Sequence, residues 1–238
     1  MNITKIILFA GFLTLFCSVA HAQLMKGAKD VFKTARTGLS QDEAAEGIKE
    51  ALIKGVSNGV QQVNKTDGYF KNPKIKIPFP PDAQNAEAKL RSIGFGEKVD
   101  EAILALNRAA EDAAHEAKPI FMEAIKALTI NDALNLVRGE KDAATQYLQK
   151  NTTQSLTDKF KPIIGSSLEK VNATKYWESI MSTHNKIPLV QKVNPDLEAF
   201  VTERAIMGLF TMVAQEELEI RNNPGARTSE TLKKVFGN

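Results

Sequence analysis

The chain has 238 residues and a nearly balanced charge, with 31 Lys and Arg residues against 28 Asp and Glu residues and a formal net charge of +3. Cations and acids are interspersed, so no polybasic face is expected, and nucleic acid is excluded as a partner. A chain of this length can bury one substantial core or two small ones.

Residues 1–22 have the three parts of a secretory signal peptide. Lys5 precedes an apolar run over residues 6–16, and small residues lead to Ala20-His21-Ala22. The run is shorter than the roughly 20 apolar residues that a bilayer span needs. We therefore predict cleavage after Ala22 and a periplasmic or secreted protein, with a retained anchor helix as the alternative.

Cys17 is the single cysteine of the chain. A lipoprotein signal is cut just before a cysteine, but Phe16 places a bulky ring where a small residue is required, so lipidation is not expected. Cleavage after Ala22 would remove Cys17. The mature chain would then contain no disulfide and would depend on its core for stability.

A long amphipathic helix is predicted over residues 41–64. Ser40 and Glu43 have the spacing of a capping box, and apolar residues recur every three or four positions behind it. Gly55 and Gly59 weaken this helix but would admit the close approach of another helix. Ordinary packing is the plainer interpretation of these glycines.

Residues 66–81 have the composition of an extended connector. Prolines remove amide donors and disfavour the helical conformation of the preceding residue. The segment resembles a polyproline II docking motif. The other interpretation is that it crosses the body, with Ile75, Ile77 and Phe79 fixed on the core.

Further helices are expected through most of the remaining chain, and no sustained strand pattern occurs. Pro119 should end or kink the first of them, Asn131-Asp132 should cap a short helix that closes at Gly139, and Asp142 should begin another. The predicted ranges are 97–117, 120–128, 132–138, 142–147, 153–160, 162–171 and 173–181, followed by a second connector over 184–195.

Residues 205–214 form the most apolar segment of the predicted mature chain, and charged residues flank it on both sides. This pattern is typical of a buried central helix of a bundle. Pro224-Gly225 should stop that helix, and Thr228 or Ser229 should cap a final one. We predict an all-α fold, a single-domain helical bundle over residues 23–238, with no transmembrane segment in the mature chain.

Catalytic patterns are weak throughout the sequence. His115 and His184 are too few ligands for a metal site, so neither a metal nor a cofactor is expected. Gly165-Ser166 lies within a predicted helix and is no serine nucleophile elbow. Glu216 and Glu217 point in different directions on a helix, and Glu217 with Arg221 has the spacing of a surface ion pair.

The richest polar cluster surrounds the Pro224-Gly225 turn. Two guanidinium groups beside a tight turn could hold a carboxylate or phosphate, which makes Arg221, Asn223, Arg227 and Thr228 candidate ligand-binding residues for an anion. The structural alternative pairs Arg221 with Glu217 and uses Arg227 to tie the turn to a neighbouring helix.

Seven segments of the chain form a recognisable combination. They are Gly68-Tyr69-Phe70, Asn107-Arg108-Ala109-Ala110-Glu111, Lys118-Pro119-Ile120-Phe121, Thr129-Ile130-Asn131-Asp132-Ala133, Asp142-Ala143-Ala144-Thr145 with Tyr147, residues 220–228 and residues 232–237. Together they resemble a bacterial exported family catalogued as a domain of unknown function, the DUF4197 type. The resemblance implies a single helical domain behind a signal peptide and brings no activity, ligand or catalytic residue with it.

Two functions follow as hypotheses. The first is a non-enzymatic binding or interaction domain of the cell envelope, which docks an envelope protein or holds a small anionic or lipidic ligand between helices. The alternative is a hydrolase that uses carboxylates from separate helices, for example Glu111, Asp132 and Asp142. Carboxylates that converge in a deep pocket would favour the enzyme.

Overall fold

The computed structural model describes residues 40–186, 192 and 196–237. The predicted signal peptide with Cys17 and the cleavage site lies outside the described residues, and so does most of the connector predicted over 184–195. No strand occurs in the described part of the chain. None of the described helices is long and apolar enough to span a membrane.

The described part of the chain is mostly helical. In chain order the helices are α3 (Gln41–Val63), η2 (Pro81–Ala83), α4 (Gln84–Ser92), α5 (Gly96–Ala113), η3 (Ala114–Glu116), α6 (Ala117–Lys126), α7 (Ile130–Arg138), α8 (Ala143–Lys170), α9 (Ala173–His184), α10 (Leu197–Asn222), η4 (Pro224–Ala226) and α11 (Glu230–Phe236).

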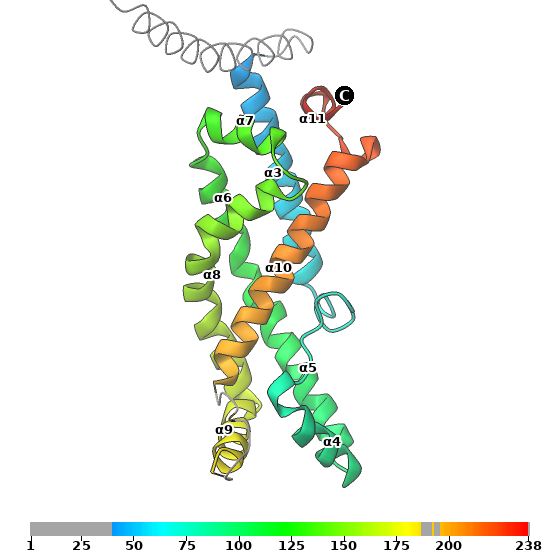
Figure 1. Cartoon of the computed structure of the whole chain (residues 1–238), viewed down its shortest axis with the longest axis vertical. Coiled ribbons are helices and arrows are strands. Elements are labelled where there is room, and N and C mark those ends of the chain that lie inside the picture. Colours follow the sequence, from blue (N-terminus) through cyan, green and yellow to red (C-terminus); the bar gives the residue numbers. More distant parts are fainter. Residues whose placement is uncertain (1–39, 187–191, 193–195, 238) are drawn as a thin grey trace, which may run out of the picture.

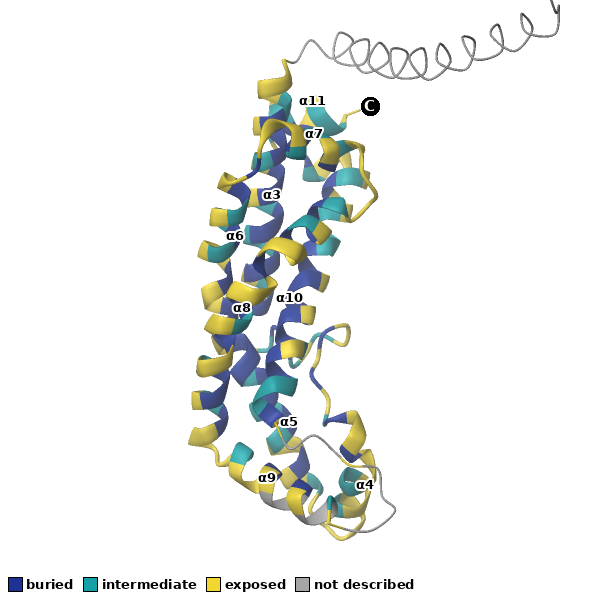
Figure 2. Cartoon of the chain, turned by 60° about the vertical axis from the view of Figure 1, so that its left-hand side comes forward, coloured by how far each residue is buried: buried dark blue, intermediate teal, exposed yellow. Residues whose placement is uncertain are grey.

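These helices form one elongated all-α bundle, as the sequence predicts. Helix α10 packs on both α3 and α8, and α5 also packs on α8. Helices α7 and α11 lie at the end where α3 begins, whereas α4 and α9 lie at the opposite end (Figure 1). The buried faces of α3, α8 and α10 form a continuous core along the long axis (Figure 2).

Helix α10 is the central helix that the apolar segment 205–214 predicts. It is longer than that segment, and a narrow face is open to solvent because Met207 and Thr211 are exposed. Close packing with α3 depends on Gly59, since a Cβ atom placed there would lie 3.2 Å from the backbone nitrogen of Val213.

Helix α8 corrects the prediction of separate helices over 142–147, 153–160 and 162–171. It is continuous over 28 residues with Pro162 inside it. Buried residues recur every four positions from Leu148 to Leu168 and form one unbroken face. Burial of this face outweighs the single backbone hydrogen bond that the proline removes.

Two boundaries also differ from the sequence prediction. The break between α5 and α6 is the 3₁₀ turn at 114–116, and Pro119 lies in the first turn of α6, where a missing amide donor is tolerated. Helix α7 is capped by Thr129, whose capping box with Asp132 replaces the predicted cap at Asn131-Asp132. Helix α4, which has no buried residue, was not predicted.

Candidate functional site

The turn predicted to bind an anion is held by hydrogen bonds within the chain. Arg227 is only 9% exposed, and its Nε and Nη2 donate to the carbonyl oxygens of Ile220 (3.0 Å) and Arg221 (2.8 Å) at the end of α10. The Oδ1 of Asn223 accepts from the Gly225 amide at 2.9 Å, and the Thr228 hydroxyl accepts from Lys54 at 2.9 Å. Arg227 thus ties the turn to the end of α10, and Lys54 ties it to α3.

Arg221 is also engaged, and not at the surface. Its guanidinium donates to Glu217 Oε1 from Nε (3.0 Å) and Nη2 (2.7 Å), and the two side chains are only 14% and 9% exposed. The predicted surface ion pair is therefore a mostly buried one. Arg221 Nη2 also donates to the carbonyl oxygen of Leu136 at 2.8 Å. Anion binding by Arg221 stays a prediction that would require these bonds to be exchanged.

The Glu217–Arg221 pair caps the ends of two other helices. Its carboxylate accepts from the amides of Ala144 (3.1 Å) and Thr145 (2.8 Å) in the first turn of α8, and from the Thr145 hydroxyl (2.8 Å). Arg221 meets carbonyl groups in the last turn of α7. An acid at a helix N-terminus and a cation at a C-terminus both complement the helix dipole.

An apolar cleft lies beside this ion pair. Its enclosed volume is about 30 Å³, enough for one or two water molecules. Glu217 and Arg221 are the only charged residues among the described residues that line it, and they neutralise each other. The lining comes from five helices: Ile48, Ala51, Leu52, Gly55 and Val56 of α3, Leu136 and Val137 of α7, Ala144 and Thr145 of α8, Val213, Glu217, Ile220 and Arg221 of α10, and Phe236 of α11.

Helix α11 covers one side of this cleft. Leu232 is fully buried against Ala51 and Ile220, and the Phe236 ring lies 5.8 Å from the guanidinium carbon of Arg221. Thr231 and Val235 contact α3 at Gly47, where a Cβ atom would lie 2.6 Å from the Thr231 methyl carbon. Gly47 therefore lets α11 sit directly on α3.

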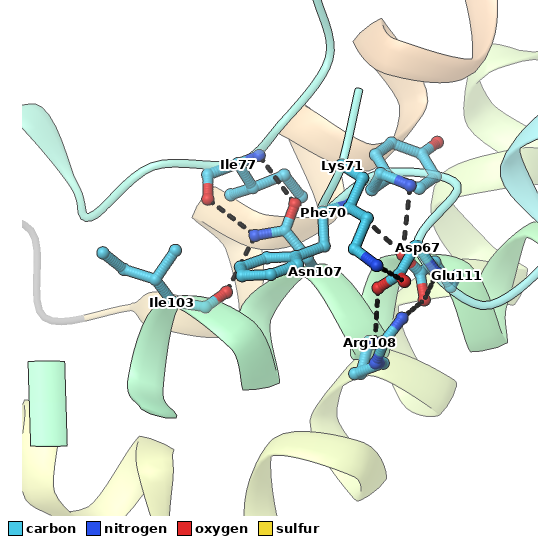
Figure 3. Close-up of polar contacts among 9 residues, drawn as sticks. Asp67, Phe70, Lys71, Ile77, Ile103, Asn107, Arg108 and Glu111 are labelled. Atoms are coloured by element: carbon cyan, nitrogen blue, oxygen red, sulfur yellow. Dashed lines mark hydrogen bonds and ion pairs between the residues drawn. The ribbon is translucent and has the colours of Figure 1, made fainter. Parts of the chain in front are cut away.

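A second polar cluster fixes the connector 66–81 to α5 (Figure 3). The Asn107 side chain is buried; it accepts from the Ile77 amide and donates to the Ile77 carbonyl oxygen, both at 2.8 Å. Ile75 and Ile77 are buried, and the Phe79 ring meets Trp177 edge to face at 5.5 Å. The connector thus crosses the body, as one of the two sequence interpretations predicts.

Glu111 holds the first turn of the same connector. Its carboxylate accepts from the amides of Asp67 (3.2 Å), Tyr69 (3.0 Å) and Phe70 (3.2 Å). Arg108 bridges Glu111 (2.5 Å) and Asp67 (2.6 Å). The hydrogen bond from Lys71 is the largest cause that lowers the pKa of Asp67, and the hydrogen bond from Arg108 is the next largest. The cluster holds backbone in place and leaves no open face for a ligand at Glu111, which is 4% exposed.

The three carboxylates proposed for a hydrolase have separate structural roles. Glu111 binds the connector, Asp132 completes the capping box of α7, and Asp142 accepts from Gln146 at 2.9 Å. No group of three or more His, Cys, Asp or Glu side chains that could hold a metal occurs among the described residues. The side chain of His184 lies outside the described residues.

The chain was compared with families of known proteins. The model of a family described as "Protein of unknown function (DUF4197)" matches residues 38–237. The chain belongs to the DUF4197 family. Comparison with curated proteins and with solved structures gives no match.

The residues that carry the DUF4197 resemblance occupy the contacts described above. Asn107 and Glu111 hold the connector, Thr129 and Asp132 cap α7, and Thr145 meets Glu217. These residues of the resemblance therefore have structural roles in the fold. The cleft was not predicted from the sequence, because its small residues come from two helices, α3 and α8, that are distant in sequence. The apolar spacing of Leu232, Val235 and Phe236 was its one local signal.

Proposed function

We propose that this DUF4197 chain is a non-enzymatic binding domain of the cell envelope, and that the cleft under α11 holds the apolar part of a lipidic ligand. One observation carries the proposal: the cleft is lined by apolar side chains of α3, α7, α8 and α10, and its only charged lining groups already bind each other and the adjacent helix ends. Such a lining recognises hydrocarbon and leaves no group free for acid or base chemistry.

The small residues of the lining support a ligand site over an ordinary packing defect. Ala51, Gly55 and Ala144 face the cleft from α3 and α8, although a larger apolar side chain would bury more surface there. A Cβ atom on Gly55 would lie 3.6 Å from its nearest neighbour, so the glycine is not required for helix packing.

The envelope location rests on the sequence. The charged start, the apolar run and Ala20-His21-Ala22 together predict export and cleavage after Ala22. Mass measurement of the protein from a periplasmic extract tests this directly. A mature chain that starts at Gln23 supports the proposal, and an intact Met1 in the cytoplasmic fraction contradicts it.

Ligand binding is tested with N-phenyl-1-naphthylamine, an uncharged apolar fluorophore, and the mature chain. We expect saturable binding with enhanced fluorescence. Gly55→Leu should fill the cleft and weaken the affinity at least tenfold. Gly96→Leu is the matched control, because it adds the same side chain to α5, where the nearest atom to a Cβ is Arg91 Nη1 at 3.9 Å. Equal affinity of both variants would contradict a site in the cleft.

A further inference from the structure

We propose that α11 occupies the ligand site when no ligand is bound. The ligand is an uncharged aliphatic chain that binds by displacing α11. This inference rests on the proposed function and adds the chemical class of the ligand and its route of entry. The enclosed volume of about 30 Å³ is far below that of ligand pockets, which reach roughly 300 Å³ or more. A chain of several methylene groups therefore needs the space that α11 now covers.

The contacts of α11 with the body are almost entirely apolar. Leu232 is buried against Ala51 and Ile220, Val235 lies over Gly47, and Phe236 lies over Arg221. The hydrogen bonds of α11 side chains and cap are local, with the Ser229 hydroxyl accepting from the Leu232 amide and Lys233 donating to Glu230. Apolar contacts of this kind are non-directional, so the methylene groups of a ligand can replace them.

The turn before α11 is bound to the body and would stay in place when α11 is displaced. Arg227 donates to two carbonyl oxygens of α10, and Lys54 of α3 donates to the Ala226 carbonyl oxygen (2.5 Å) and the Thr228 hydroxyl (2.9 Å). These bonds hold residues 226–228 on the body. The boundary between the fixed turn and the apolar helix thus falls at Ser229, the N-cap of α11.

The charges of the cleft select against an ionic head group inside it. Arg221 is the one cation in the lining, and its guanidinium already donates to Glu217, Leu136 and Val137. A carboxylate brought beside it would also meet the Glu217 carboxylate. An ion that enters an apolar site without a free partner is strongly disfavoured. A ligand that carries a charged head group is therefore disfavoured in this cleft.

A reversible disulfide can lock α11 in place. A Cβ atom on Gly47 would lie 3.7 Å from the Cβ of Thr231, within the range of about 3.5–4.5 Å that disulfides require. The mature chain predicted to begin at Gln23 has no other cysteine. The variant Gly47→Cys/Thr231→Cys thus compares the oxidised and reduced states of one protein. Thr231→Cys alone controls for the loss of the threonine, and Gly47→Cys alone controls for the added Cβ atom, which would lie 2.9 Å from a Val235 methyl carbon.

The affinity for N-phenyl-1-naphthylamine is measured before and after reduction. We expect the oxidised double variant to bind at least tenfold more weakly than the same protein after reduction, and Thr231→Cys to be insensitive to reduction. Equal affinities in the two states would overturn displacement of α11. Absence of binding by the wild-type chain as well would instead overturn the proposed function.

The charge of the ligand is tested with a matched pair of probes. The dye 8-anilino-1-naphthalenesulfonate carries a sulfonate on nearly the same aromatic frame, and we expect it to bind at least tenfold more weakly than the uncharged dye. We also expect 1-dodecanol to compete at lower concentration than dodecanoate. Tighter binding of the two anions would overturn the uncharged class and would favour an anion site at Arg221.

Discussion

Glu217 and Arg221, one turn apart on α10, hold the ends of two other helices as well as each other. The carboxylate accepts from the first amides of α8, and the guanidinium donates to the last carbonyl groups of α7. One ion pair thereby fixes the α7–α8 corner and forms the polar wall of the cleft. The pair stabilises the site without serving as its ligand-binding group.

Arg221→Met should lower the free energy of unfolding by about 3–5 kcal/mol, because it leaves the mostly buried Glu217 carboxylate without its cation. Urea denaturation measures the loss. Lys233→Met is the control, since it breaks an exposed pair with Glu230 and should change stability by less than about 1 kcal/mol. Similar small effects of both substitutions would contradict a structural role for Arg221.

Gly208→Ala should destabilise the protein by about 1–3 kcal/mol, because overpacking forces buried neighbours to shift. A Cβ atom at Gly208 would lie 2.6 Å from the buried ring of Tyr69. Gly55→Ala makes the same change in α3, where the Cβ atom would be in ordinary contact with Glu216 at 3.6 Å, and it should be neutral or stabilising by up to about 1 kcal/mol. In thermal unfolding, the midpoint temperature should therefore fall for Gly208→Ala, whereas it should stay the same or rise for Gly55→Ala.

Tyr69→Phe should reduce the free energy of unfolding by about 1 kcal/mol at neutral pH. The buried hydroxyl donates to the Ala205 carbonyl oxygen at 2.6 Å. Burial, and next the Glu111 carboxylate, raise the pKa of Tyr69 above its usual value.

The raised pKa of Tyr69 makes its contribution to the stability of the protein depend on pH. Above the ordinary tyrosine pKa of about 10, the unfolded chain loses this proton while the folded chain keeps it, so the contribution to stability declines as pH rises. Urea denaturation at pH 8 and pH 11 should show a smaller difference between wild type and Tyr69→Phe at pH 11. A difference that stays constant would mean that Tyr69 titrates normally.

Asn107→Ala should release the connector from α5, because the amide and carbonyl groups of Ile77 lose their buried partner. Trp177 is the single tryptophan and packs on Phe79 of the connector, so its fluorescence emission should shift to longer wavelength. Asn151→Ala removes an exposed amide on α8 and should leave the emission unchanged. Unchanged emission in both variants would contradict this role of Asn107.

Local patterns in the sequence predict much of this fold. The Ser40–Glu43 capping box and the apolar run at 205–214 mark α3 and the core of α10 correctly, because caps and periodic burial act over a few residues. The continuity of α8 could not be predicted in this way. Its unbroken buried face overrides Pro162 only when the neighbouring helices are in place.

The candidate site was less predictable than the fold. Glu217 and Arg221 were recognised as a pair from their spacing, but the α8 amides that Glu217 binds lie more than 70 positions earlier in the chain. Burial of the pair, and the contact between Gly47 and α11, also depend on which helices become neighbours. Sequence spacing identifies helix faces, and only the tertiary structure shows which faces meet.

The most direct test is methyl NMR spectroscopy of the mature full-length chain during titration with 1-dodecanol. We predict that methyl signals of Ile48 and Val213 in the cleft shift, that Leu232 of α11 moves towards the chemical shift of an exposed leucine, and that Ile93, which is 59% exposed on the α4–α5 turn, stays unchanged. Shifts at Ile93 with unchanged Ile48, Val213 and Leu232 would contradict the binding site under α11.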